Sequence, residues 1–240
     1  MKPIWINALV VVALPVMLHG AEHPDMLTPA YHKDNAIHDR VDAFIAASRK
    51  TMLHHPLEDD KGKLPEYRVP SMGRFGAGKG PTRTEQHHPA VDLHVGGRET
   101  AVELFAAHDG IISTVRDAPK YRHYIAITKP VTDKNGKILG KMVTLYGHVD
   151  LDLDEAGGLH MDGKQVKAGD LISKHLYSGT RGGPHLHFEI RYYRPSDSGT
   201  EEFYSFRESA SSIGAWPYGF WDPEHGYGYA DPKNHGLVFY

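Results

Sequence analysis

The most distinctive chemical pattern in the sequence is the segment 183–191, which reads GPHLHFEIR and holds two histidines two residues apart. Alternate side chains of a strand share a face. In such a strand, the side chains of Leu186, Phe188 and Ile190 would point toward the core. The side chains that would point away from it are His185, His187, Glu189 and Arg191. Two histidines on the polar face of one strand can reach one centre, so the segment predicts a metal or catalytic site. An incidental pair is the alternative.

Two further segments carry residues of the same chemistry. In HPAVD, residues 88–92, His88 and Asp92 are four apart, a spacing that puts both side chains on one side in a helix or a strand. Imidazole nitrogen and carboxylate oxygen are ordinary zinc ligands. The third segment, VTLYGH at 143–148, is an apolar strand that ends in His148. Either segment by itself would be a weak signal.

In this order the three segments resemble the lysostaphin-type (LytM-type) zinc metallopeptidases of bacterial cell walls. That family's pattern is His-x-Gly-x-Asp, then Tyr-x-His, then a glycine-rich turn into Gly-Pro-His-Leu-His-Phe-Glu. The segments FAAHDGII at 105–112 and VKAGDLI at 166–172 are also similar to the family. The resemblance spans residues 69–191, about half of the chain. One departure is Ala90, which stands where the family has glycine and affects the backbone approach near the site rather than the ligands.

The resemblance implies that His88, Asp92 and His187 bind one Zn²⁺ per chain and that His148 and His185 surround an open coordination position. A catalytic zinc keeps three protein ligands and lowers the pKa of a water in the fourth position to about 7. The sequence has no HExxH helix to supply a glutamate base. Proton transfer and oxyanion stabilisation therefore fall to His148 and His185, in roles that the sequence does not divide between them.

These expectations define a zinc metalloendopeptidase, a hydrolase that attacks peptide bonds of peptidoglycan stem peptides or cross-links with a zinc-activated water. The alternatives are a non-hydrolytic cell-wall-binding or regulatory module of the same fold and a zinc peptidase acting on exported proteins. Peptidoglycan peptides are the expected partner, and a monomer is favoured. The net charge of −3 provides no basic field for nucleic acid. The absence of cysteine excludes disulfides, thiolate metal sites and a cysteine nucleophile.

The elements that must position these residues are short β segments separated by glycine. The expected strands lie at 101–106, 111–115, 124–128, 142–146 and 186–191. No βαβ rhythm is present, which predicts a mostly β fold: an antiparallel-sheet metallopeptidase domain with long groove-forming loops. Asn135-Gly136 favours a two-residue hairpin turn. Asp150, Asp152 and Asp154 alternate but lack the spacing of an EF-hand, so a solvated loop is expected there.

The sequence divides into four parts. Residues 1–20 form an expected signal peptide, because eleven apolar residues from 8 to 18 are too few to span a membrane. This predicts export to the periplasm or cell surface, with no transmembrane anchor after cleavage. Residues 21–68 form an N-terminal extension, 69–194 the zinc metallopeptidase domain, and 195–240 an aromatic, Gly/Pro-rich, loop-rich C-terminal tail. The tail's rings are expected to cap the domain or, alternatively, to offer a stacking surface for sugars or peptides.

Smaller expectations concern the extension and the remaining histidines. The extension contains one amphipathic helix, whose apolar face is formed by Val41, Phe44, Ile45, Ser48 and Met52. Whether the extension inhibits the site is left open. Histidines 54 and 55 are expected in solvent, as are histidines 23, 32, 38, 225 and 235. Histidines 94, 108, 123, 160 and 175 are expected to be packing or groove residues rather than ligands.

Overall fold

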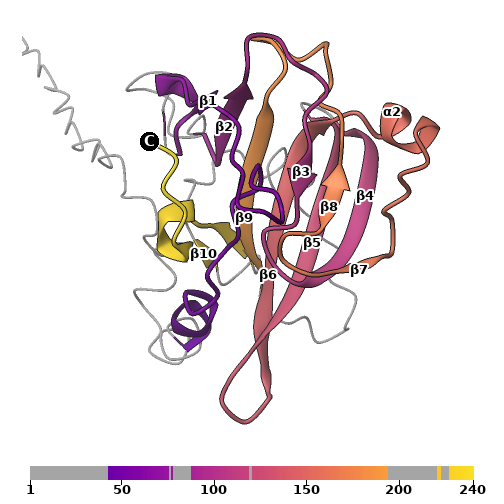
Figure 1. Ribbon diagram of the computed structural model, residues 1–240. Coiled ribbons are helices and arrows are strands. Elements are labelled where there is room, and N and C mark those ends of the chain that lie inside the picture. Colours follow the sequence, from indigo (N-terminus) through magenta and orange to yellow (C-terminus); the bar gives the residue numbers. More distant parts are fainter. Residues whose placement is uncertain (1–42, 76, 78–87, 119–120, 194–220, 223–226) are drawn as a thin grey trace, which may run out of the picture.

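The computed structural model describes residues 43–75, 77, 88–118, 121–193, 221–222 and 227–240, and it is built mainly from antiparallel strands (Figure 1). The expected signal peptide and the contribution of Val41 to the helix face lie outside these residues. No helix in the described part is long and apolar enough to cross a bilayer.

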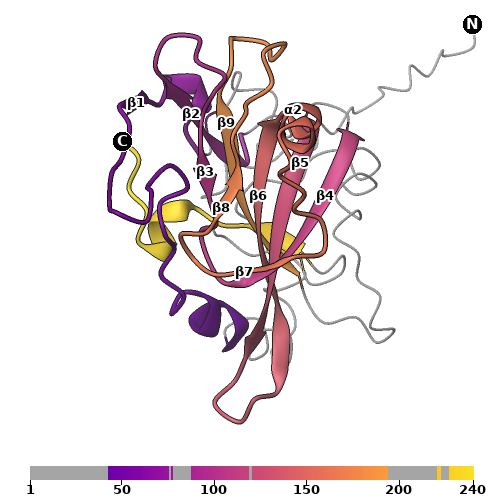
Figure 2. The same cartoon turned by 45° about the vertical axis from the view of Figure 1, so that its right-hand side comes forward.

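Within the described residues, nine strands form the main sheet, and its path β1-β2-β9-β6-β5-β4-β7 can be followed in Figure 2. β11 also pairs with β9, and β10 pairs with β11. Its strands are β1 (Tyr67–Arg68), β2 (Ala90–Val95), β4 (Gly110–Ala118), β5 (Arg122–Thr132), β6 (Ile138–Val149), β7 (Gln165–Val166), β9 (Leu186–Tyr193), β10 (Trp221–Asp222) and β11 (Tyr227–Tyr229). A second sheet pairs β3 (Leu104–Phe105) with β8 (Leu171–Ser173). The helices with assigned bounds are α2 (Leu151–Ala156) and the 3₁₀ turns η2 (Ser71–Gly73) and η4 (Pro232–His235).

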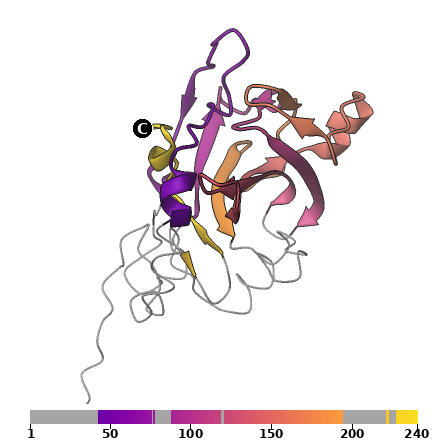
Figure 3. The ribbon, with the colours of Figure 1, turned by 90° about the horizontal axis from the view of Figure 1, so that it is seen from below.

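The mostly β, antiparallel fold class is confirmed, and strands lie at all five expected positions. Seen from below, the strands follow an arc rather than a flat layer (Figure 3). Apolar side chains of β2, β6 and β9 fill one face of the arc: Val91, Leu93, Tyr146, Leu186, Phe188 and Ile190 are all buried there. The backbone N–H of Ala107 donates to the Tyr146 hydroxyl at 2.6 Å. The tyrosine of the Tyr-x-His segment therefore belongs to the core rather than to the site.

The hairpin between β5 and β6 differs from the expected two-residue turn. Thr132 pairs with Ile138, so five residues form the loop, and only Gly136 of the Asn-Gly pair has a positive φ, of 82°. A type I′ turn needs positive φ at both central residues. The Asp133 carboxylate instead accepts the backbone N–H groups of Asn135 and Lys137, which stabilises the wider loop.

The segment after His148 is not the expected solvated loop. Asp150 caps α2 by accepting the N–H of Leu153, and Asp154 is buried at 2% exposure. The Asp154 carboxylate accepts hydrogen bonds from the Ser173 hydroxyl at 2.6 Å and from His175 Nδ1 at 2.8 Å. The buried Asp154 carboxylate connects the helix to the last residue of β8 and to the chain just after it, a role that the alternating pattern of aspartates does not reveal.

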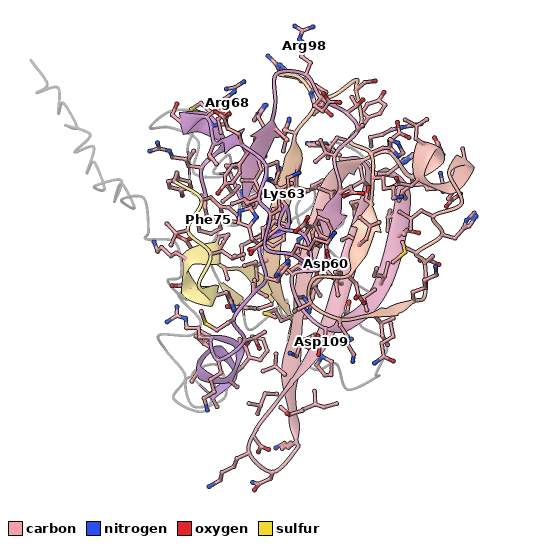
Figure 4. The ribbon with its side chains drawn as sticks, in the orientation of Figure 1. Asp60, Lys63, Arg68, Phe75, Arg98 and Asp109 are labelled. Atoms are coloured by element: carbon pink, nitrogen blue, oxygen red, sulfur yellow. The ribbon has the colours of Figure 1, made fainter. Side chains whose placement is uncertain are left out.

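The chain segments on both sides of the central domain pack against it. Residues 43–48 are helical, with Phe44 and Ser48 buried, while Met52 lies outside this helix and is exposed. Figure 4 places Asp60 and Lys63 of the same N-terminal segment over the middle of the molecule. At the other end, β11 pairs with β9. β1 pairs with β2, and β11 pairs with β9 on the edge that β2 also occupies, so both segments extend the sheet on the side of β9 that faces away from β6.

Two histidine predictions in these flanking segments are wrong. His235 is fully buried: it accepts the hydroxyl of Tyr192 at 2.6 Å and donates from Nδ1 to the carbonyl of Thr51. His55 is half-buried, and burial lowers its pKa to about 4, assisted by the nearby His54. Both histidines join segments that are distant in sequence, and local polarity could not indicate those contacts.

Candidate metal centre and active site

Strand pairing brings the three predicted metal ligands to one point. Asp92 of β2 lies directly opposite His187 of β9, and His88 lies two residues before β2, with its ring beside the Asp92 carboxylate. His88 Nε2 is 3.2 Å from Asp92 Oδ1, His187 Nδ1 is 3.0 Å from the same oxygen, and the two nitrogens are 3.3 Å apart. A tetrahedral ion with bonds of about 2.0–2.2 Å separates its ligand atoms by roughly 3.3–3.6 Å. The triangle is therefore close to the size that such an ion requires, and its ligand atoms would move apart by a few tenths of an ångström on binding.

The electrostatics of this triangle favour positive charge. Burial by itself would raise the pKa of Asp92, but hydrogen bonds from His187 and His88 hold it below its usual range. Burial by itself would lower the pKa of His187, but its hydrogen bonds to Asp92 and Glu189 raise it to about 9. A carboxylate that stays ionised beside a histidine that retains a proton marks a position where a cation is stabilised.

The Nε2 atom of His187, on the far side of the ring from Asp92, is hydrogen-bonded to a buried carboxylate. This nitrogen donates to Glu189 Oε1 at 2.8 Å, which leaves Nδ1 directed at Asp92 and His88. Arg191 Nε donates to the other carboxylate oxygen, Oε2, at 2.6 Å. Glu189 and Arg191 have no exposed surface, so the polar face of β9 is enclosed rather than open to water. Burial raises the pKa of Glu189, but the Arg191 charge and the His187 hydrogen bond overcome this and lower it to about 2.

The two other predicted site histidines stand next to the triangle. The His148 ring lies 4.7 Å from that of His185 and 5.5 Å from that of His187, centroid to centroid. His185 Nε2 lies 3.6 Å from Asp92 Oδ1. His148 Nδ1 donates to the Tyr121 carbonyl and His185 Nδ1 to the Gly183 carbonyl. Because a carbonyl only accepts, each neutral ring carries its lone pair on Nε2.

Both histidines remain neutral at ordinary pH. Burial lowers the pKa of His148 to about 3, assisted by the charges of His187 and His185. Burial also lowers the pKa of His185, against the opposing effect of Asp92. His148 has a φ of +64°, a left-handed backbone that a residue other than glycine adopts only when its surroundings enforce it. Each ring is therefore a fixed hydrogen-bond acceptor beside the triangle.

Small residues allow this close packing. A Cβ on Gly147 would lie 2.8 Å from the Tyr121 ring and 3.3 Å from His187. A Cβ on Gly73 would lie 2.8 Å from the Cβ of Asp92. Ala90, which replaces the family glycine, is fully buried opposite Glu189, so its methyl group is accommodated on the site face of the sheet.

The sequence motifs did not mark all residues of the site. Tyr121 contacts both His148 and His187 but stands in no recognised motif. His94, expected as a packing residue, stacks on His185 at 4.6 Å. Glu189 and Arg191 share the period-two face of His187, and that alternation was the available signal for them. No comparable pattern points to Tyr121.

A second group of metal-binding residue types lies elsewhere. His123, Asp150 and Asp152 bring potential ligand atoms within 4.8 Å of one another. Here, however, Arg116 donates to one Asp152 oxygen and Arg122 to the other, the latter at 3.3 Å. The two guanidinium groups occupy that carboxylate and supply positive charge of their own. This group does not have the electrostatics of the first.

The chain has distant similarity to several solved structures. No curated protein matches the chain. Among solved structures, it is similar to a zinc-containing peptidase from Vibrio cholerae (22% identity, TM-score 0.41), covering 63% of this chain and 40% of that one. It is also similar to Helicobacter pylori Csd3, with 22% identity and a TM-score of 0.36 over 60% of this chain and 30% of that one. A third similar structure is lysostaphin from Staphylococcus simulans, with 19% identity and a TM-score of 0.36 over 68% of this chain and 56% of that one. The chain thus spans less than half of the first two proteins.

The family assignment comes from the sequence comparison. Residues 86–198 match the model of Peptidase family M23. The matched segment contains all five predicted site residues and the strands β2 and β9 that carry Asp92 and His187. Residues 86–198, just under half of the chain, therefore match peptidase family M23, in agreement with the lysostaphin type that the three motifs resemble.

Proposed function

We propose that this protein is a zinc-dependent endopeptidase that hydrolyses peptide bonds in peptidoglycan stem peptides or cross-links. The observation that carries the proposal is the triangle of His88, Asp92 and His187, whose three ligand atoms lie 3.0–3.3 Å apart with two neutral histidines beside it. The match of residues 86–198 to a peptidase family supports the hydrolase class.

His88 Nε2, one Asp92 oxygen and His187 Nδ1 would hold the ion. The donor set is two imidazoles and one carboxylate, which suits Zn²⁺, and three protein ligands leave a position for substrate or water. When bound, the zinc would act as a Lewis acid on the scissile carbonyl and make water acidic enough to react near neutral pH. Glu189 keeps the His187 ring oriented, because Nε2 is already committed to it.

His148 and His185 would perform the proton transfers. Each presents Nε2 as an acceptor, so either can take a proton from the attacking water and return it to the leaving amine. The other would have to take up a proton at Nε2 before it could donate a hydrogen bond to the carbonyl oxygen as charge develops there, because its Nδ1–H is already bound to a backbone carbonyl. Their Nδ1 hydrogen bonds to backbone carbonyls hold the rings in orientation while the protons move.

The wall substrate and the location rest on sequence. The three motifs resemble cell-wall peptidases, and the apolar stretch at 8–18 has the length of a signal peptide. We propose that the protein is exported and meets peptidoglycan in the periplasm or at the cell surface.

The test is digestion of purified peptidoglycan with and without a chelator, read by mass spectrometry of the released fragments, together with metal analysis. Unfolded β-casein serves as a parallel protein substrate. We expect one zinc per chain and chelator-sensitive release of wall peptides. Cleavage of casein alone would refute the wall substrate, and a protein with neither zinc nor cleavage would refute the peptidase.

Two variants separate binding from chemistry. His148→Ala and His185→Ala should keep zinc bound but lose cleavage, because neither residue belongs to the ligand triangle. If both cleaved at the wild-type rate, the assignment of proton transfer to these histidines would be wrong.

A further inference from the structure

The hydroxyl group of Tyr121 is connected to the candidate metal centre through Glu189, the residue that binds the His187 ring. Tyr121 immediately precedes β5 and is buried. Its hydroxyl donates to Glu189 Oε1 at 2.7 Å, the same oxygen that accepts His187 Nε2 at 2.8 Å. A carboxylate oxygen that receives two hydrogen bonds from different directions has little freedom to rotate. Tyr121 therefore helps to fix the oxygen that orients His187.

Through its backbone, the same residue reaches the other half of the site. The Tyr121 carbonyl accepts the backbone N–H of His148 at 3.2 Å and the ring Nδ1–H of His148 at 3.1 Å. These two bonds, with the bond from Tyr177 N–H to the His148 carbonyl, constrain the left-handed backbone at His148 and set its ring tautomer.

Tyr121 also packs between the two histidines. Its ring meets the His187 ring edge-on, at 5.3 Å and 72°, and lies closer to parallel with the His148 ring, at 6.2 Å and 30°. Gly147, directly opposite His187 in the sheet, leaves the room for this contact. The side chain thus occupies the space in which either imidazole would otherwise turn.

We propose that Tyr121 is a positioning residue that couples the metal ligand His187 to the proton-transferring His148. The inference rests on the proposed function of those two histidines. Tyr121 is only 6% exposed and its hydroxyl is directed at Glu189, so it acts through its neighbours rather than on the substrate. The Glu189–Arg191 pair completes the arrangement, because Arg191 donates to the Glu189 oxygen Oε2, which does not receive the bond from His187.

The chain offers a matched control. Tyr192, on β9, is also buried and its hydroxyl also makes one short hydrogen bond, to His235. Tyr192 pairs with Gly228 and belongs to the opposite face of the strand from His187 and Arg191. Tyr121→Phe and Tyr192→Phe each delete one buried hydroxyl, and only the first deletion touches the site.

The experiment measures zinc affinity by chelator competition and the visible absorption of the Co²⁺-loaded protein in wild type, Tyr121→Phe and Tyr192→Phe. We expect Tyr121→Phe to weaken zinc binding by about tenfold, the low end for outer-shell partners, and to shift the Co²⁺ bands. Tyr192→Phe should leave both unchanged. Should Tyr121→Phe unfold, Glu189→Gln tests the same connection, with the same loss expected.

The outcomes separate the two proposals. A wild-type protein that binds zinc, with wild-type affinity and Co²⁺ spectrum in Tyr121→Phe and Glu189→Gln, overturns the positioning role alone. Equal losses in Tyr121→Phe and Tyr192→Phe also overturn it, because the effect would then be one of general packing. A wild-type protein that binds no zinc overturns the proposed function and the inference together.

Discussion

Among the described residues, two groups of three histidine and aspartate side chains could hold a metal ion, and the two groups differ in what surrounds them. The ligand atoms of His88, Asp92 and His187 lie within 3.3 Å of one another, on and beside two paired strands. In the second group, Asp150 and Asp152 belong to the start of α2, and Asp152 is bound by two arginines. Residue types and proximity alone do not distinguish the two groups.

Charge distinguishes them. In the first group, hydrogen bonds to carboxylates raise the pKa of His187. In the second, burial and then the charge of Arg122 lower the pKa of His123. One group attracts a cation, and the other already holds two guanidinium groups at its carboxylate. The comparison shows that a candidate metal site must be judged by the charges around its ligands as well as by their spacing.

The largest difference is expected from matched amide substitutions, Asp92→Asn and Asp152→Asn. Asp92→Asn removes the only anionic ligand of the first group, so zinc affinity should fall by more than about 100-fold, beyond the range for outer-shell residues, and peptide cleavage should be lost. Asp152→Asn should leave zinc affinity within about twofold, since its exposed ion pairs contribute little. Chelator competition measures both. A larger loss in Asp152→Asn would reverse the comparison.

Zinc should also stabilise the fold through the first group alone. A ligand at about 1,000 times its Kd adds about 4 kcal/mol to the free energy of unfolding, or roughly 8–16 °C in Tm for a chain of this size. Differential scanning calorimetry with zinc and with chelator should show this shift in wild type and Asp152→Asn. The shift should vanish in Asp92→Asn, and its persistence there would place the ion elsewhere.

A smaller effect on zinc affinity is expected when a glycine near each group is replaced by alanine. Gly73→Ala puts a methyl group 2.8 Å from the Cβ of Asp92, an overpacking that costs about 1–3 kcal/mol and displaces a ligand. Zinc affinity should drop by about tenfold. Gly157→Ala, beside α2, meets carbonyl oxygens at 3.3–3.4 Å and should not change zinc affinity. Isothermal titration distinguishes the two, and equal affinities would show that Asp92 is not confined by Gly73.

The smallest effect concerns pH. Because the pKa of His123 is depressed in the folded protein, the unfolded chain binds more protons as pH falls below about 6.5. Stability from this residue is present above that pH and is lost as pH falls toward the folded pKa. His123→Asn should therefore reduce the decline in unfolding free energy between pH 7 and 5, measured by urea denaturation. An unchanged slope would mean that burial and the charge of Arg122 do not lower the pKa of His123 in the folded protein.

Local patterns in the sequence accounted for much of the fold and for the candidate site. Alternation identified β9 and its two faces, and the motif order selected His88, Asp92, His148, His185 and His187, which the structure brings together. The ligand roles of these residues stay predictions until an ion is measured. These successes have a common cause: strand periodicity and ligand spacing are properties of a few consecutive residues.

The tertiary structure decided what depends on pairing between distant segments. Register places Asp92 opposite His187, and burial turns Glu189, Arg191 and His235 from apparent surface groups into interior ones. Backbone contacts from Tyr121 and Tyr177 hold His148 in its left-handed conformation. In the second group, Arg116 and Arg122 bind the Asp152 carboxylate, which makes that group a poor metal site. The sequence by itself determined which side chains are able to bind a metal and move protons. Only the long-range contacts decided their separation, their surrounding charge and which nitrogen each histidine presents.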